Sequence, residues 1–407
     1  MILRTNNKIM ALYAILTAIL CSGHAFQTIF PALGYMVIPI AGVAFIFELA
    51  DKNCWRLDKL RGAILLFVIM ILCTMITTLG SGAVFYVTVL SYAIAAYGIC
   101  RWYSFKDFVN YYLKIMTVVT VVGVVGYILV QATSVMEMLP VIENINDVEY
   151  HIAGIFNYIT LTPERNCGMY WEPGMFATHL TVAMALEIMT KKKPNPWRMI
   201  LFSAGIFTAN SSAGFALWFL CVMLLLVKNA NVQNVVSSIM AMIILCIGVV
   251  VVLNFDNILQ QTGLIDNEYF AKLETDSVAD SSRIKALEHN LKSFLSAPIF
   301  GVGIATATEQ MQHVADTSTS TYLMSIFGIM GIAYTVYWAI GIFKLPKVNI
   351  LAKVLLLVIV LVILNKEPHH QILMTWCLLF YLLKGDFGWS KDRKTEGNPH
   401  LCVGRKA

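Results

Sequence analysis

The sequence predicts an all-α polytopic integral membrane protein with about twelve transmembrane helices, and three observations support this fold class. Hydrophobic residues make up 58% of the 407 residues and charged residues only 13%, about half the charged share of a typical soluble protein. Apolar runs of the length needed to cross a bilayer recur along the chain. Lysine and arginine concentrate in alternate connections between these runs, as they do on the cytoplasmic side of membranes.

Twelve apolar windows define the predicted helices in chain order. A helix of about 20 apolar residues spans the hydrocarbon core of a bilayer. Most windows approach that length, and the two on either side of Asn210 are shorter. The windows are residues 9–26, 28–48, 63–80, 82–100, 114–131, 173–190, 198–211, 213–228, 235–254, 321–343, 349–365 and 369–384. The even count places both ends of the chain on the same side of the membrane.

Placing the N-terminus in the cytoplasm gives a marked charge asymmetry. Of the 29 lysines and arginines, 23 then lie on the cytoplasmic side, whereas 16 of the 24 acidic residues lie on the exported side. The six exported basic residues are Arg165, Lys272, Arg283, Lys285, Lys292 and Lys366. We therefore expect a membrane domain over residues 1–384 and a basic cytoplasmic tail over 385–407. No nucleic-acid partner is expected, because the basic charge follows membrane orientation and forms no groove.

Two exported loops, residues 132–172 and 255–320, are much longer than the usual connections between neighbouring helices. Long loops commonly carry function because a rigid scaffold can position their side chains. We expect both loops to contain short amphipathic helices.

The second loop shows the clearer helical pattern. Apolar residues recur every three or four positions after Asp280–Ser282, which supplies N-cap candidates. They are Ile284, Leu287, Leu291 and Phe294 or Leu295. Pro298 ends this helix, and Gly301 and Gly303 permit a tight turn after it. Arg283 then lies in the first turn, off the apolar stripe, where it can reach a ligand.

Arg165 and Arg283 are the candidate anion-binding residues, one in each exported loop. Arginine offers a planar fork that binds two phosphate oxygens at once, whereas lysine would serve equally well for contact with lipid headgroups. Headgroup anchoring, or pairing with a neighbouring carboxylate, is the alternative role for both residues.

Glu172 is the candidate general base. It stands directly before Pro173 and an apolar run, a position that also suits a carboxylate that only stabilises the start of a helix. His179 lies seven residues, about two turns, further along the same face. It is either part of a substrate site or a hydrogen-bonded core histidine.

No metal ion or cofactor is expected from the sequence. Neither exported loop contains an Asp-x-Asp pair. The nine cysteines include no Cys-x-x-Cys pair and no spacing typical of a zinc site.

Three short motifs resemble those of a known family. They are Arg165-x-x-Gly168-x-x-x-Glu172-Pro173 before a helix, Ser282-Arg283 at the start of an amphipathic helix, and Pro298-Ile-Phe-Gly-Val-Gly303 after it. With the number of spans and the positions of the two long loops, residues 160–331 resemble the O-antigen ligase and polymerase superfamily of bacterial envelope glycan assembly.

The resemblance implies a glycosyltransferase of the bacterial cytoplasmic (inner) membrane whose active face lies outside the cytoplasm. Its donor and acceptor would be oligosaccharides linked to polyprenyl pyrophosphate in the lipid bilayer, with a chain-length regulator and a flippase as partner proteins. By this resemblance Arg165 and Arg283 hold the pyrophosphate and Glu172 is the base. The remaining substrate-binding candidates are Ser282, Gly301, Gly303, His313, Thr317 and His179.

A missing histidine favours polymerase over ligase activity. Ligases of this family carry a histidine followed by Asn, Ser or Gln, nine residues and Gly-x-x-Gly, and the matching window here is Thr317-Ser318 before Gly328-Ile-Met-Gly331. Thr317 cannot accept a proton as an imidazole can, His313 lies four residues too early, and Ser212 stands where the family carries a cation. Ligase-type glycan transfer and a twelve-helix polysaccharide or solute transporter are the alternatives.

The charge asymmetry predicts which loops can be reached from outside the cell. Single cysteines at positions 140 and 270, in a background without other cysteines, should react with a membrane-impermeant thiol reagent in intact cells. Cysteines at positions 56 and 192 should react only after the membrane is permeabilised. Labelling of position 192 from outside would contradict the predicted orientation.

Overall fold

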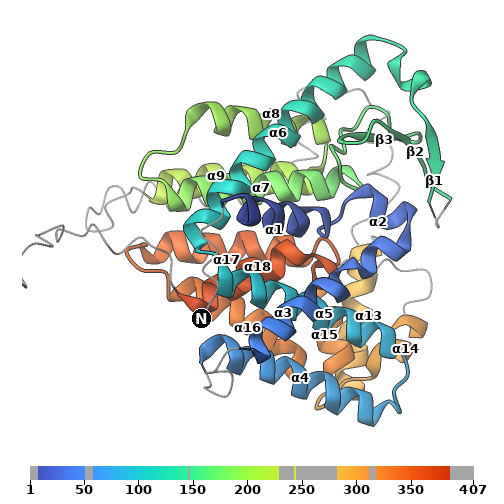
Figure 1. Cartoon of the computed structure of the whole chain (residues 1–407), viewed down its shortest axis with the longest axis vertical. Helices are drawn as coiled ribbons and strands as arrows, with labels where there is room; N and C mark the ends of the chain where they lie inside the picture. Colours follow the sequence, from blue (N-terminus) through green and yellow to red (C-terminus); the bar gives the residue numbers. More distant parts are fainter. Residues whose placement is uncertain are drawn as a thin grey trace, which may run out of the picture.

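The computed structural model describes residues 8–50, 58–144, 147–228, 243, 282–310 and 318–385, and this part of the chain is mostly helical (Figure 1). Several predictions lie outside it. They concern the span 235–254, most of the loop 255–320 with His313 and Thr317, and the tail 385–407 beyond its first residue.

Four long apolar segments have the character of membrane helices. They are residues 31–49, which comprise the 3-10 helix η1 (Pro31–Met36) and α3 (Val37–Leu49), together with α4 (Lys59–Thr77), α5 (Ala83–Trp102) and α6 (Phe105–Ala132). Each is long and apolar enough to cross a bilayer, as the second to fifth windows predict. The other apolar helices in the described part of the chain are shorter, so the count of twelve spans stays a prediction.

The first predicted helix, residues 9–26, is broken in the structure. α1 (Lys8–Leu20) ends before a turn, and the short α2 (Ala25–Ile29) follows it. Gly23 in the turn has a φ of +89°, which residues with a side chain rarely adopt. The Gln27 side chain accepts a hydrogen bond from the Gly23 N–H at 2.7 Å. The apolar composition hides this break because the turn is made largely of small residues.

The middle of the chain follows the prediction more closely. α7 (Pro173–Thr190) matches its window, and α8 (Pro196–Ala209) and α9 (Ser212–Lys228) differ from theirs by one or two residues. Proline at the first or second helical position starts both α7 and α8, because a missing N–H there leaves no hydrogen bond unmade.

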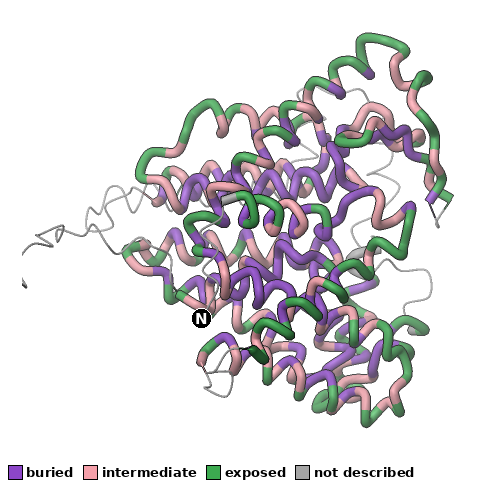
Figure 2. Tube along the Cα trace, viewed as in Figure 1, coloured by how far each residue is buried: buried purple, intermediate pink, exposed green. Residues whose placement is uncertain are grey.

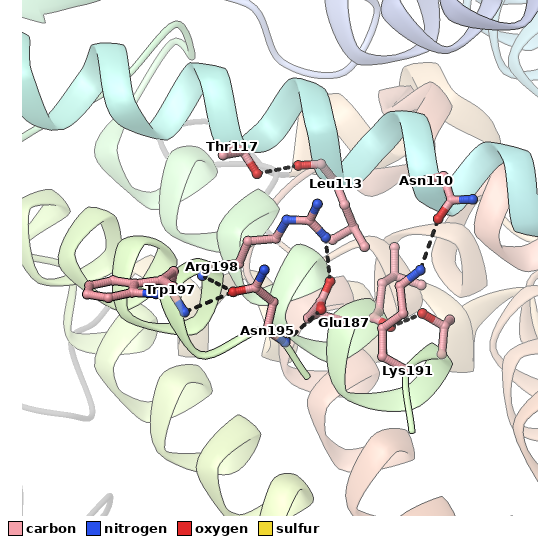
Figure 3. A network of polar contacts seen from close by, with 10 residues as sticks. Asn110, Leu113, Thr117, Glu187, Lys191, Asn195, Trp197 and Arg198 are labelled. Carbon is pink, nitrogen blue, oxygen red and sulfur yellow. Dashed lines mark hydrogen bonds and ion pairs between the residues drawn. The ribbon is translucent and has the colours of Figure 1, made fainter. Parts of the chain in front are cut away.

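A polar network holds the turn between α7 and α8 (Figure 3). The buried Glu187 carboxylate accepts hydrogen bonds from the Asn195 N–H at 2.9 Å and from the Arg198 guanidinium at 3.0 Å. Lys191 donates to the Asn110 side chain of α6 at 3.0 Å. The network compensates a buried charge and ties the end of α7 to α6.

The loop 132–172 contains a small sheet in place of the expected amphipathic helix. Strands β1 (Val141–Glu143), β2 (Glu149–Ile152) and β3 (Asn157–Ile159) pair antiparallel in that order. The helical part of this loop is the one-turn 3-10 helix η2 (Val135–Met138). The all-α prediction was therefore wrong in this loop.

The sheet forms because one of its faces packs on α2. Tyr150 and Ile152 of β2 form a buried cluster with Ala25 and Ile29, and alternate residues of a strand share one face. The Tyr150 hydroxyl donates to the Trp171 carbonyl oxygen at 2.8 Å. Burial raises the pKa of Tyr150 to about 12, so the phenol stays protonated and remains a donor.

The described part of the second long loop, residues 282–310 and 318–320, is largely helical, and helices were expected there. They include α13 (Ser282–Ser296) and α14 (Gly303–Gln310). The predicted apolar stripe of α13 does not face the protein, because Leu287 and Leu291 are exposed whereas Asn290 is buried. The buried Asn290 donates to the Thr321 hydroxyl of α15 (Thr319–Phe327) at 3.1 Å.

The predicted span 321–343 is two helices, α15 (Thr319–Phe327) and α16 (Ile329–Phe343). Gly328 joins them with a φ of +62°, which glycine adopts without strain. A Cβ on Gly331 would lie 2.0 Å from the Leu323 carbonyl oxygen. Gly-x-x-Gly is thus the corner at which the two helices pack backbone against backbone.

The last two windows correspond to α17 (Ile350–Leu364) and α18 (Leu373–Lys384), with the 3-10 helix η4 (His369–Gln371) between them. α17 has 15 residues and α18 has 12. Such helices are about 22 and 18 Å long, shorter than the ~30 Å hydrocarbon core. The residues that connect them, 365–372, are here called the α17–α18 break.

Buried side chains run through the middle of the molecule, with exposed residues around it (Figure 2). α5 and α18 pack against each other there. Aromatic rings fill the interior of this region, as in the edge-to-face contact of Phe67 with Trp376 at 5.1 Å between ring centroids. Figure 1 shows the sheet, α2, α13 and α14 at one end of the long helices, here called the loop end.

Candidate functional site

The start of α7 is the first part of the candidate site. Glu172 occupies the N-cap position with an extended backbone, and Pro173 takes the first helical position. The Glu172 side chain makes no capping hydrogen bond to the helix. The half-buried carboxylate therefore does not cap the N–H groups of α7.

Lys366 reaches this helix start from the α17–α18 break. It is 3% exposed, and its ammonium donates to the Gly174 carbonyl oxygen at 2.6 Å and to the Thr178 hydroxyl at 3.4 Å. The Glu367 carboxylate lies 4.0 Å from the Lys366 Nζ. A buried ammonium requires such partners, because an uncompensated charge in a low-dielectric interior is very costly.

Three charged side chains converge on Gly174. A Cβ at this position would lie 2.9 Å from Lys366 Nζ, 3.0 Å from Glu172 Oε1 and 3.2 Å from Glu367 Oε1. The two carboxylate oxygens are thus separated by at most the sum of the last two distances, about 6 Å, within the range at which like charges disfavour each other. Glu172, Lys366 and Glu367 form what we call the charged cluster.

Hydrogen bonds to Thr319 fix the α17–α18 break. The Thr319 hydroxyl, at the start of α15, donates to the Glu367 carbonyl oxygen at 2.7 Å and accepts from the His369 N–H at 2.6 Å. The His369 ring nitrogen Nδ1 lies 2.8 Å from the Thr375 hydroxyl. The first two bonds satisfy backbone groups beyond the end of α17, where helical hydrogen bonding stops.

The break after α1 packs against the same region. The Leu373 N–H donates to the Cys21 carbonyl oxygen at 3.3 Å, and the Met374 N–H donates to the Ser22 hydroxyl at 2.8 Å. The first turn of α18 is thus capped by residues from the opposite end of the chain. The two helix breaks therefore lie side by side.

His179 lies fully inside this region. Its Nε2 donates to the Ser22 carbonyl oxygen at 2.9 Å, and its Nδ1 lies 3.2 Å from the Tyr112 hydroxyl. The ring stacks on Tyr170 with 4.4 Å between centroids. This is the arrangement of a hydrogen-bonded core histidine, and the role of His179 in substrate binding stays a prediction.

Arg165 lies at the C-terminal end of α8. Its Nε donates to the Ala209 carbonyl oxygen at 3.4 Å, and a cation is favoured at that end of a helix. Arg165 and Glu172 both act electrostatically on the buried Cys167. Burial raises the pKa of the Cys167 thiol far above its ordinary value, so the thiol stays neutral.

The glycine of the Arg165-x-x-Gly168 motif makes a turn next to α7. Gly168 has a φ of +55°, and a Cβ there would lie 2.8 Å from the Phe176 ring. The Asn166 side chain accepts from the Gly168 N–H at 2.8 Å and donates to the Thr208 hydroxyl at 3.0 Å. The motif therefore places Arg165 against α8 and Glu172 at the start of α7.

α13 runs parallel to α15, which brings its first turn toward the charged cluster. The Asn290 amide donates to the Thr321 hydroxyl at 3.1 Å, and after both helices the Ile329 N–H donates to the Pro298 carbonyl oxygen at 2.7 Å. Arg283 precedes Asn290 by seven residues, which is about 10 Å of helix. Its backbone therefore lies toward the start of α15, whose first residue holds the α17–α18 break.

The other predicted substrate-binding residues divide into two groups. Gly301 and Gly303 serve close packing, since a Cβ would lie 2.1 Å from the Ile326 carbonyl oxygen at the first and 2.3 Å from the Thr78 Cγ2 at the second. The roles predicted for the remaining residues involve side chains outside the described part of the structure. These residues are Ser282, Arg283, His313 and Thr317.

The motifs of the sequence do not single out Lys366 and Glu367 as site residues. The sequence places Lys366 in a connection between two predicted helices, and the structure buries its side chain there. A signal was present, because Lys-Glu-Pro-His-His, residues 366–370, interrupts two apolar runs that are each short for a membrane helix. Ionisable residues within membrane segments are expensive and generally mark functional positions.

An apolar cavity of about 80 Å³ lies next to the charged cluster, between α7, α16, α17 and α18. Val182, four residues after Thr178, and Ile363, three residues before Lys366, belong to its walls. The cavity, which is lined almost wholly by apolar side chains, therefore begins about one helical turn from the polar contacts of Lys366.

Within the described ranges, no group of three or more His, Cys, Asp or Glu side chains is placed to hold a metal ion. No protein-family model matches the sequence, and no curated protein is significantly similar to it.

The contacts of Thr319 predict a stability effect. Thr319→Val keeps the shape of the side chain but leaves the Glu367 carbonyl and the His369 N–H without this partner. We expect a loss of about 1–3 kcal/mol, measured by thermal unfolding in detergent. Thr88→Val is the matched control, because the Thr88 hydroxyl is exposed and bonds within its own helix. Equal unfolding temperatures for both variants would contradict the role of Thr319.

Proposed function

We propose that this protein is a polysaccharide polymerase of the bacterial cytoplasmic membrane. It would join lipid-linked oligosaccharide repeats into O-antigen, capsular or exopolysaccharide chains on the outer face. The observation that carries the proposal is the convergence of Glu172 with Lys366 and Glu367 at Gly174. A carboxylate that its own helix does not use, held among buried charges in an apolar helical protein, suits acid–base chemistry at a membrane surface.

In the proposed reaction, an acceptor hydroxyl attacks the anomeric carbon of the donor sugar. A carbon–oxygen bond forms as the bond from the anomeric carbon to the pyrophosphate oxygen breaks. Glu172 takes the hydroxyl proton, and the electron pair of the broken bond stays on the polyprenyl pyrophosphate. Arg165 and Arg283 stabilise the charge that develops on this leaving group.

The apolar cavity, at about 80 Å³, offers a surface for only a small part of the isoprenoid tail of a lipid-linked substrate. Its walls begin one helical turn from the Lys366 contacts and continue along α7 and α17. Such a substrate has a polar pyrophosphate followed by an apolar isoprenoid tail. It therefore requires a polar surface with an apolar surface next to it.

Transport of a polysaccharide or a small solute is the second candidate. It is favoured by the burial of Lys366 and Glu367, because ionisable groups inside helical membrane proteins often mark transport pathways. The two functions differ in a direct way. Purified enzyme in detergent should elongate lipid-linked repeats without sealed vesicles or a gradient, which a transporter cannot do.

The polymerase proposal predicts the surface glycan of a mutant strain. Deletion of the gene should leave single-repeat material, and Glu172→Gln should reproduce this profile, because glutamine keeps the size of the side chain but accepts no proton at neutral pH. Thr317→Ala should be far milder. The measurement is a gel profile of the surface glycan. Long carrier-linked chains in the deletion strain would indicate a ligase. A normal ladder in the Glu172→Gln strain would show that Glu172 is not the base.

The two arginines predict a separate effect. Arg165→Lys and Arg283→Lys keep the charge but lose the bidentate fork, so each should reduce long-chain product strongly. Protein abundance, measured by immunoblot of the membranes, should stay near normal. Full chain length in both variants would favour the headgroup-anchoring role.

A further inference from the structure

We propose that Lys366 and Glu367 are positioning residues that hold Glu172 in its reactive orientation. The inference rests on the proposed function, since it concerns the base of that reaction. The supporting observation is that three charged groups meet around Gly174. Their nearest atoms lie 2.9–3.2 Å from the point that a Cβ on Gly174 would occupy.

The contacts of Lys366 connect two parts of the chain. An ammonium has three N–H donors, and three of the groups around this one are the Gly174 carbonyl, the Thr178 hydroxyl and the Glu367 carboxylate. Two of these belong to the first turns of α7, and the third belongs to the α17–α18 break. Lys366 thereby fastens the break to the helix that Glu172 begins.

Electrostatics gives Lys366 its effect on Glu172. Two carboxylates about 6 Å apart repel each other in a weakly solvated site. The Lys366 ammonium lies near the same point as both carboxylates and offsets that repulsion. Without it, Glu172, which is only half-buried, is free to rotate away from Glu367.

A purely structural role would not require these charges. Apolar side chains of similar volume usually join buried elements at least as stably as an ion pair does. The break is also fixed independently by Thr319 and by the contacts of α18 with Ser22. These bonds do not involve the ammonium, so they remain available to the backbone in a variant that lacks it.

Gly174 offers a way to disturb the cluster without removing a charge. Gly174→Ala introduces a Cβ into the point where the three groups meet, and the atoms that must move are the ends of flexible side chains. Gly62→Ala in α4 is the matched control, because a Cβ there has no neighbour within 4 Å.

The test compares Lys366→Met, Glu367→Gln, Gly174→Ala and Gly62→Ala in the full-length protein purified in detergent, with lipid-linked single repeats as substrate. We expect kcat to fall about 100-fold in the first three variants, because small misplacements of a catalytic group cost that much. KM should change little, and Gly62→Ala should match the wild type. Unchanged kcat in Lys366→Met and Glu367→Gln would overturn the inference.

A second readout does not depend on catalysis. Glu172 is labelled with a water-soluble carbodiimide and an amine, and its modification is followed by peptide mass spectrometry. The labelling rate should rise in Lys366→Met and Gly174→Ala, and stay at the wild-type value in Gly62→Ala. If the wild type elongates no glycan but these rates rise, the proposed function fails while the positioning role stands. If the rates stay equal, the positioning role is wrong.

Discussion

The burial of two charged residues in the α17–α18 break is the constraint on which the arrangement of the helix ends depends. Lipid and apolar side chains offer no hydrogen bonds, so Lys366 and the broken backbone around it need partners from the protein. α7 supplies them through Gly174 and Thr178, and α15 through Thr319. The starts of these helices therefore meet at one place.

The long loops are ordered by the same helix ends. The sheet of the loop 132–172 packs on α2, and Tyr150 bonds to the backbone just before Glu172. α13 lies along α15 through polar groups such as Asn290, which leaves its apolar residues exposed. The loop end thus combines a centre of packed helix starts with exposed surface segments.

This arrangement would separate the tasks of the proposed reaction on a lipid-linked sugar. Glu172 lies half-buried at the edge of the helical core, Lys366 lies fully inside it, and the apolar cavity begins one turn deeper. A proton acceptor, a fixed charge and an apolar space then follow one another along α7. Preorganisation of this kind is effective because the groups need not rearrange during the reaction.

The sequence by itself determined the helical, membrane-type character, the start of α7 at Pro173 and the helix at Ser282, because composition, periodicity and caps are local properties. It also singled out Glu172. The tertiary structure alone decided the helix breaks, the sheet and the inward face of α13. These depend on which distant segments supply hydrogen bonds and close packing, as Ser22 does for α18. Lys366 was read as a loop charge for the same reason, since only the fold places its partners on α7 around it.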